Sequence, residues 1–323
     1  MHHAALYALL LSAALSGGVL ATADAPAATG RAPTVFAPGA IAGDADDGAA
    51  AFTPEGDTVV FMRGTDSFSL MESHRVHGRW STPVPAAFSG RWRDLDPAMA
   101  PDGSYLLFVS NRPERPGQGP IDAVLGKQRH AGAGMNLWRV DRHGDGWGTP
   151  VRLPDTVNAC STTFAPSVAG DGSIYYIGCD PTDGTLRLLH AGVRDGHYLA
   201  PIRVAIGGDR FVIRDPAIAQ DRSFLVVSMK PVGSQLPYRL AISFHSEAGW
   251  SLPRDLGDVV NGGKHSMGAQ LGPDHRTLTF YSDRRLAPPD PRADAAWNNG
   301  DDHIWQVSLA PWLDAHAQRK HAH

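Results

Sequence analysis

Short apolar runs separated by tight polar turns recur along the whole chain. The clearest pair of runs is DPAMAPDGSYLLFVSNRP, at residues 96–113, where two strand-length apolar segments flank a Pro-Asp-Gly turn. Weaker copies of this pattern start at residues 50, 164, 215 and 268. An apolar run of four to eight residues, a turn residue cluster and a second such run are typical of a β-hairpin. The pattern therefore predicts a series of hairpins and an all-β protein.

The copies recur at a regular interval. Their turn acids lie 47 to 69 residues apart, at Glu55, Asp102, Asp171, Asp221 and Asp274. We assign these acids no function beyond turn geometry, which Asp and Gly favour. Self-similarity at such a period indicates stacked β modules, and the β-propeller is the closed form of such an array.

A second phrase follows four of the hairpins, with an aromatic residue three positions before a proline. The phrases are GRWSTP at residues 78–83, DGWGTP at 145–150, GHYLAP at 196–201 and AGWSLP at 248–253. A third apolar stretch lies between hairpin and phrase, so each unit supplies four strands, as a propeller blade does. We expect the aromatic ring to cover the gap between neighbouring blades, although a ligand-stacking role is the alternative.

The last unit lacks this phrase. The segment APTVFAPGAIAGD, residues 32–44, is similar to the fourth-strand segment TPVRLPDTVNA, residues 149–159. We therefore expect the early segment to complete the last blade, which removes an unpaired sheet edge. The prediction is a single propeller over residues 33–310 with about five four-stranded blades, six remaining possible.

Two units carry insertions, at residues 113–134 and 285–300. Both follow the second strand and precede the third, so both should emerge on one face of the ring, and loops of this length are often functional. The remaining residues, 311–323, read as a polar, frayed C-terminal tail.

The N-terminus predicts export. Residues 1–23 contain no Lys, Arg, Asp or Glu, and an apolar run ends at the small-residue triplet Ala21-Thr22-Ala23. This is typical of a secretory signal peptide, with an uncleaved membrane anchor as the alternative. We expect a linker at 24–32 and a periplasmic or secreted product. No later stretch is apolar enough to span a bilayer.

Export changes the interpretation of the two cysteines. Cys160 and Cys179 flank the third hairpin, whose turn brings its two ends together. In an oxidising compartment they are disulfide candidates, with two small buried thiols as the alternative. Two cysteines without a nearby pair of histidines do not form a zinc site, and we expect no metal or cofactor.

The phrase at 96–113 resembles the WD40-like, TolB-type propeller repeat of many exported bacterial proteins. The resemblance covers about residues 33–310, and only the second copy has the full Pro-Asp-Gly turn. It implies a periplasmic propeller that binds partners, and it supplies no catalytic residues. The same repeat resembles the propeller gate of some serine peptidases, but no hydrolase domain accompanies it in this chain.

Catalytic motifs are absent from the sequence. There is no Gly-x-Ser-x-Gly elbow, His-Glu-x-x-His, phosphate loop or dinucleotide fingerprint. The formal net charge of −4 gives no reason to expect nucleic acid.

One set of charged residues is a candidate site. The innermost strands begin, and the second strands end, at the same mouth of a propeller channel. This places eight charged residues around one opening: Asp94, Asp96, Arg112, Arg214, Asp215, Lys230, Asp283 and Arg284. They would tie neighbouring blades together, bind a polar ligand, or serve as general acid and base.

We therefore expect a monomeric, non-enzymatic propeller that binds an envelope protein or a small polar ligand at the loop-bearing mouth. The alternatives are a propeller hydrolase acting on a carbohydrate or lactone through mouth carboxylates, and a plain scaffold.

Overall fold

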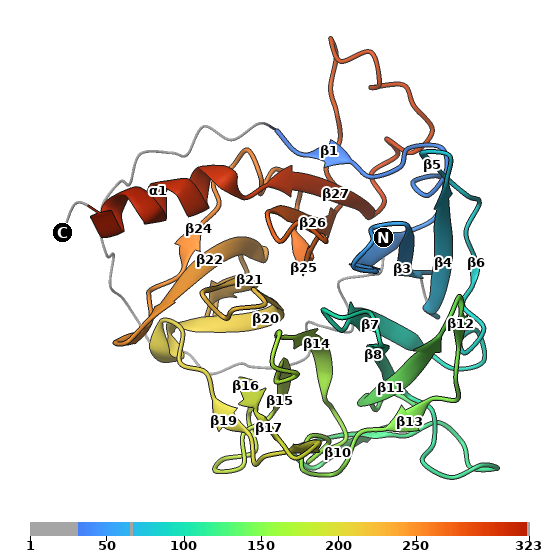
Figure 1. Cartoon of the computed structure of the whole chain (residues 1–323), viewed down its shortest axis with the longest axis vertical. Helices are drawn as coiled ribbons and strands as arrows, with labels where there is room; N and C mark the ends of the chain where they lie inside the picture. Colours follow the sequence, from blue (N-terminus) through green and yellow to red (C-terminus); the bar gives the residue numbers. More distant parts are fainter. Residues whose placement is uncertain (1–31, 65–66, 322–323) are drawn as a thin grey trace.

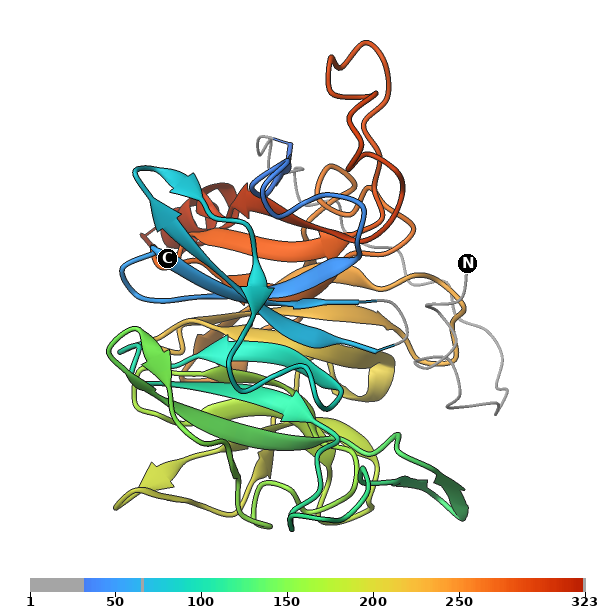
Figure 2. The ribbon, with the colours of Figure 1, turned by 90° about the vertical axis from the view of Figure 1, so that its right-hand side faces the viewer.

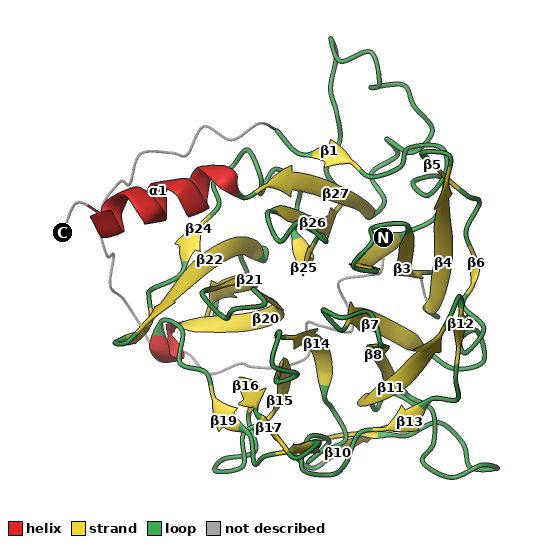
Figure 3. Ribbon diagram, in the orientation of Figure 1, coloured by secondary structure: helices red, strands yellow, loops and turns green. Residues whose placement is uncertain are grey.

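A computed structural model describes residues 32–64 and 67–321. The predicted signal peptide and all but the last residue of the predicted linker lie outside the described residues. The fold is a five-bladed β-propeller, in which the innermost strands surround a central axis (Figures 1 and 3). The predicted fold class is thus confirmed, with five blades rather than six.

The blades follow one another along the chain, and within each blade the strands run in order from the axis outwards. Blade 1 contains β2 (Asp47–Phe52), β3 (Thr58–Arg63), β4 (Ser69–Val76), β5 (Arg79–Trp80) and β6 (Val84–Pro85). Blade 2 contains β7 (Asp94–Met99), β8 (Tyr105–Ser110), β11 (Asn136–His143), β12 (Gly146–Trp147) and β13 (Val151–Arg152). Blade 3 contains β14 (Phe164–Val168), β15 (Ile174–Cys179), β16 (Leu186–Ala191) and β19 (Ile202–Arg203), with the small hairpin β17 (Val193–Arg194) and β18 (His197–Tyr198).

The last two blades complete the ring. Blade 4 follows a short 3-10 helix (Gly208–Arg210) and contains β20 (Phe211–Ile218), β21 (Phe224–Pro231), β22 (Arg239–Ser246), β23 (Gly249–Trp250) and β24 (Arg254–Asp255). Blade 5 contains β25 (Met267–Leu271), β26 (Thr277–Ser282), β27 (His303–Ser308) and, outermost, β1 (Thr34–Val35). The largest core cluster joins buried residues of blades 1 to 4, among them Leu70, Leu107, Tyr176 and Val227.

The first two strands of each blade form the predicted hairpins. In the second copy, Asp102 Oδ1 accepts a hydrogen bond from the backbone N–H of Ser104 at 3.0 Å. The same contact, two residues along the chain, is made by Asp171, Asp221 and Asp274. These acids therefore stabilise the turns, as local side-chain bonds of this kind do.

The fourth strand of four blades is short because the aromatic phrase interrupts it. A proline in each phrase removes a backbone donor, so the outer segment pairs in two-residue pieces. The aromatic residues contact the preceding blade. Trp147 Nε1 donates to Glu72 Oε2 of blade 1 at 2.8 Å, and the Trp250 ring lies 6.2 Å from that of Tyr175 in blade 3. The phrase therefore ties neighbouring blades together.

Residues from the two ends of the propeller share blade 5. Thr34 pairs with Gln306 and Val35 with Trp305, and the backbone N–H of Phe36 donates to the Ile304 carbonyl at 2.8 Å. The segment 34–36 near the start of the described chain thus lies against β27, the last strand, beside the buried Trp305.

The C-terminal segment differs from the expected frayed tail, because residues Ala310–His321 form helix α1 along the outer edge of blades 4 and 5 (Figure 1). Trp312 is 9% exposed and belongs to the core cluster of these blades, and His316 stacks on Phe244 at 3.8 Å. Ser308 Oγ accepts the first helical N–H, from Ala310. In the sequence, Ser308 and Trp312 are the two residues that indicate a helix here. The mostly polar composition of the segment instead favours the prediction of a frayed tail.

Both insertions lie between second and third strands, and we call this side of the ring the mouth face. The first forms the hairpin β9 (Ala123–Leu125) and β10 (Gln128–His130), which projects from the propeller in the side view (Figure 2). The second is held by Asn298, which bonds both the N–H and the carbonyl of Leu286 at 2.8 Å, and by the buried Trp297. Both insertions therefore have a defined conformation that hydrogen bonds hold in place.

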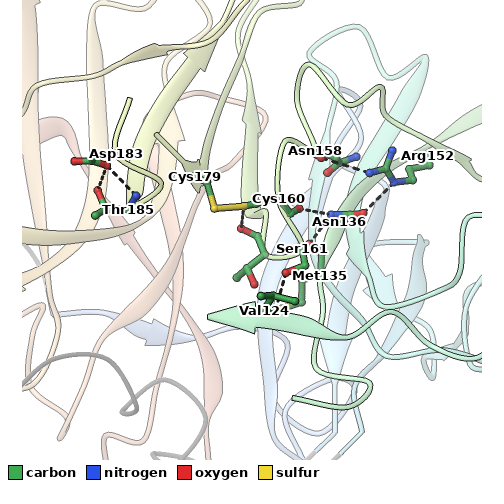
Figure 4. Close-up of a disulfide and its surroundings, with 11 residues drawn as sticks. Val124, Met135, Asn136, Arg152, Asn158, Cys160, Ser161, Cys179, Asp183 and Thr185 are labelled. Carbon is green, nitrogen blue, oxygen red and sulfur yellow. Dashed lines mark hydrogen bonds between the residues drawn. A yellow bond between two sulfur atoms is a disulfide. The ribbon is translucent and has the colours of Figure 1, made fainter. Parts of the chain in front are cut away.

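Cys160 and Cys179 form a disulfide on the mouth face, between the segment before β14 and the end of β15 (Figure 4). The bonded segment supports the first insertion. Ser161 Oγ accepts the Val124 N–H at 2.8 Å, and the Ser161 carbonyl accepts the Met135 N–H at 2.8 Å. The disulfide thus fixes the base on which β9 and β10 rest.

Replacing both cysteines by serine should lower the free energy of unfolding by about 3 kcal/mol, because the disulfide closes a loop with a sequence separation of 19 residues. Urea denaturation of wild type and of the double variant measures this. The wild type in reducing agent should shift to the variant's midpoint. An unchanged midpoint in both would contradict the prediction.

Candidate functional site

The centre of each innermost strand carries a β-bulge. The pairing register with the second strand shifts in all five blades, and one residue of each bulge has a positive φ. These residues are Ala49, Asp96, Ala165, Asp215 and Gly268. A bulge interrupts the alternation of side chains along a strand and redirects one residue. Together the five residues line a small space on the axis.

Two of these bulge residues are aspartates, Asp96 and Asp215, which we call the channel carboxylates. The backbone N–H of Ala165, in the next blade, donates to Asp96 Oδ2 at 3.2 Å. In the same way the N–H of Gly268 donates to Asp215 Oδ2 at 3.0 Å. Each carboxylate therefore links its blade to the bulge of the following one.

The channel carboxylates resist ionisation. Burial raises the pKa of Asp96 to about 7, and the charge of Asp215 adds to this rise. Burial also raises the pKa of Asp215, which is only 8% exposed. Two carboxylates that share a buried site disfavour each other's charge, so a proton is retained there to higher pH than in water.

Little space remains along the axis. The gap between the channel carboxylates is about 10 Å³, which is the room of a single water molecule. The side chain of Gln270 in blade 5 donates to the Pro97 carbonyl in blade 2 at 3.2 Å and so crosses the axis. A larger cavity, of about 80 Å³, opens on the opposite side, beside the hairpin turns. The sequence pattern indicated no function for that face.

The other predicted site residues do not all lie at the axis. Asp94 is fully buried inside blade 2, where Arg112 Nη2 donates to its Oδ1 at 2.8 Å. The hydroxyls of Ser89 and Ser110 also donate to Asp94, at 2.7 and 2.6 Å. This pair holds the blade and the preceding linker together.

Asp283 and Arg284 lie on blade 5 and contact the loop before it. Asp283 Oδ1 accepts the Lys264 N–H at 2.8 Å, and Arg284 donates to the Val259 carbonyl at 3.0 Å. The guanidinium of Arg284 also lies 5.1 Å from the Trp305 ring centre. Both side chains are therefore engaged in holding the rim of this blade.

Arg214 and Lys230 are the remaining predicted residues, and they lie on blade 4 close to Asp215. The guanidinium of Arg214 lies 5.4 Å from the ring centre of Phe164, and Lys230 Nζ lies 4.8 Å from that of Tyr238. Neither cation forms an ion pair within the part of the chain that the structure describes, although the charge of Arg214 acts on the neighbouring carboxyl of Asp215. The sequence did not indicate the two aromatic supports, because they come from another blade and from across a loop.

No group of three or more His, Cys, Asp or Glu side chains suited to a metal ion occurs in the part of the chain that the structure describes. The same part holds no helix of the length and apolarity needed to cross a membrane.

The channel carboxylates make stability depend on pH. In the native state Asp96, with a pKa of about 7, keeps its proton at pH values where the carboxyl of the unfolded chain, with its ordinary pKa of 3.8, has lost it. The contribution of protonated Asp96 to the free energy of unfolding is therefore present at low pH and is lost as the pH rises from about 4 to 7. Asp96→Asn should thus stabilise the protein at pH 8 by on the order of 2–4 kcal/mol and change little at pH 4. Urea unfolding at both pH values measures the difference.

Asp195→Asn is the matched control, since Asp195 is exposed and also has a positive φ, 52° against 45° for Asp96. It should leave stability unchanged at both pH values. Equal stability of Asp96→Asn and wild type at pH 8 would refute the assignment.

The chain matches no family model, and no curated protein matches it. Solved structures do resemble it. An alpha-L-arabinofuranosidase from Lactobacillus brevis is 10% identical, with a TM-score of 0.51 over 84% of this chain and 92% of that one. This likeness shows a shared fold alone.

TolB proteins are also among the similar structures. TolB from Acinetobacter baumannii is 12% identical with a TM-score of 0.47, and the match covers 87% of this chain. This chain spans 64% of the length of that TolB chain. A gluconolactonase from Xanthomonas campestris is 14% identical, with a TM-score of 0.41 over 90% of this chain and 99% of that one.

Proposed function

We propose that this protein is an exported, non-catalytic β-propeller that binds a protein partner on its mouth face. The observation that carries the proposal is the first insertion, which presents a supported hairpin on that face. Its base is bonded to Ser161 beside the disulfide, while Val124 on β9 remains 56% exposed. A rigid, exposed apolar residue is the kind of group that anchors a protein interface.

Further apolar residues support the choice of this face. Val232 and Leu236, in the loop between β21 and β22, are 48% and 61% exposed, and Val259, in the loop before β25, is 52% exposed. These loops join the strands at the mouth face. Apolar side chains exposed around a polar centre favour a binding surface over a plain scaffold.

Export is supported by the apolar, uncharged residues 1–23 and by the Cys160–Cys179 disulfide, since disulfides persist in oxidising compartments.

A hydrolase acting on a carbohydrate or lactone is the second candidate, favoured by the raised pKa of Asp96 beside Asp215. Ligand pockets for small molecules usually enclose about 300–1,000 Å³. The space between the channel carboxylates is about 10 Å³, which favours binding over catalysis. Turnover on a glycoside or lactone panel that is lost in an Asp96→Asn, Asp215→Asn variant would support the second candidate instead.

The substitution Val124→Asp should abolish capture of the partner from an envelope extract, because it places a charge in the apolar contact. Val193→Asp is the matched control, since Val193 is also exposed but lies on the opposite face. The measurement is affinity purification with each variant, with thermal unfolding to verify that both are folded. Equal partner recovery with Val124→Asp and wild type would contradict the proposal.

A further inference from the structure

Blade 4 carries two cations side by side at the mouth face. Lys230 pairs directly opposite Val212, and Arg214 follows Val212 by two residues on the same strand. Residues two apart on a strand share a face, so both cationic side chains stand on one face of the blade as diagonal neighbours. Both residues are partly exposed.

An aromatic ring lies beside each of these cations. Phe164 lies under the Arg214 guanidinium and Tyr238 under the Lys230 ammonium, at 5.4 and 4.8 Å. Such contacts hold a cation in place without using its N–H groups. Within residues 32–64 and 67–321, Arg214 Nη1 donates to the Ile213 carbonyl at 2.9 Å.

One donor of Arg214 is buried without a partner. Its Nε has no hydrogen-bond acceptor among the described residues. Asp215 is a nearby carboxylate whose charge interacts with Arg214, but it accepts the Gly268 N–H and no ion pair joins the two. A buried, unsatisfied guanidinium donor is unfavourable unless a further acceptor completes the site.

We propose that Arg214 and Lys230 form a carboxylate-binding site that takes an acidic side chain of a partner peptide. A guanidinium beside an ammonium suits a carboxylate, which accepts several charge-assisted hydrogen bonds. The loop that follows Lys230 exposes Val232 and Leu236, so the preferred peptide has an aliphatic residue next to its acid. This inference rests on the proposed function and names the chemistry of its contact.

The test is selection of a displayed heptapeptide library on the purified protein, followed by affinity measurement of the selected peptides. The selected peptides should contain Glu or Asp beside Leu, Ile or Val. Their affinity should fall about tenfold or more with Arg214→Gln or Lys230→Gln, or when the acid is changed to its amide. Arg214→Lys, which keeps the charge, should lose less. Arg194→Gln, an exposed arginine on the opposite face, is the matched control and should bind as wild type does.

The outcomes separate the two proposals. Some selected peptides could bind in a Val124-dependent way and yet lack an acid, or bind the Arg214→Gln variant as tightly as wild type. Either result would overturn the carboxylate site and leave the proposed function in place. Equally tight binding of small acids such as N-acetylglutamate would show a site for free carboxylates and overturn the peptide assignment. Failure to select any peptide sensitive to mouth-face substitutions would overturn both. Thermal unfolding of each variant excludes loss of the fold as the cause.

Discussion

The propeller depends on one backbone feature, the left-handed residue in the bulge of each innermost strand. In two blades the bulge residue is an aspartate that accepts the backbone N–H of the bulge residue in the next blade. Gly268 shows how tightly the bulge packs within blade 5, since a Cβ there would lie 2.4 Å from the Tyr281 ring on β26. The contacts between blades at the axis leave only about 10 Å³ there, and burial makes the two carboxylates costly to ionise.

The charged residues near the mouth face are of two kinds: some hold the blades together, and others are placed to contact a ligand. The Asp94–Arg112 pair is buried and saturated with hydrogen bonds, so it strengthens blade 2 and has little left to offer a ligand. Arg214 and Lys230 lie against aromatic rings, and the Nε donor of Arg214 has no acceptor among the described residues. The mouth face thus combines two cations without ion pairs among the described residues, exposed apolar residues and a supported hairpin, whereas the centre of the ring is nearly filled. This combination is what favours a binding function.

Much of the architecture was predictable because propeller blades are built from local contacts. Each hairpin and its aromatic phrase lie within one repeat, so strand, turn and proline signals appear in order along the chain. Helix α1 is hard to predict because its composition is mostly polar, and the packing of Trp312 and Leu313 on the core of blades 4 and 5 follows only from the tertiary structure. The cavity beside the hairpin turns is likewise not predictable from local patterns, because residues of all five blades line it.

The sequence by itself determined the repeat, the strand order within each blade and which charged residues lie near the strand ends, because these follow from local periodicity. Only the tertiary structure decided which of those residues meet. Asp94 and Asp96 are two positions apart and would share one face of a regular strand, yet the bulge turns Asp96 to the axis and leaves Asp94 inside the blade. Register and bulges arise from the packing of whole blades, so the convergence of side chains at a site cannot be derived from spacing alone.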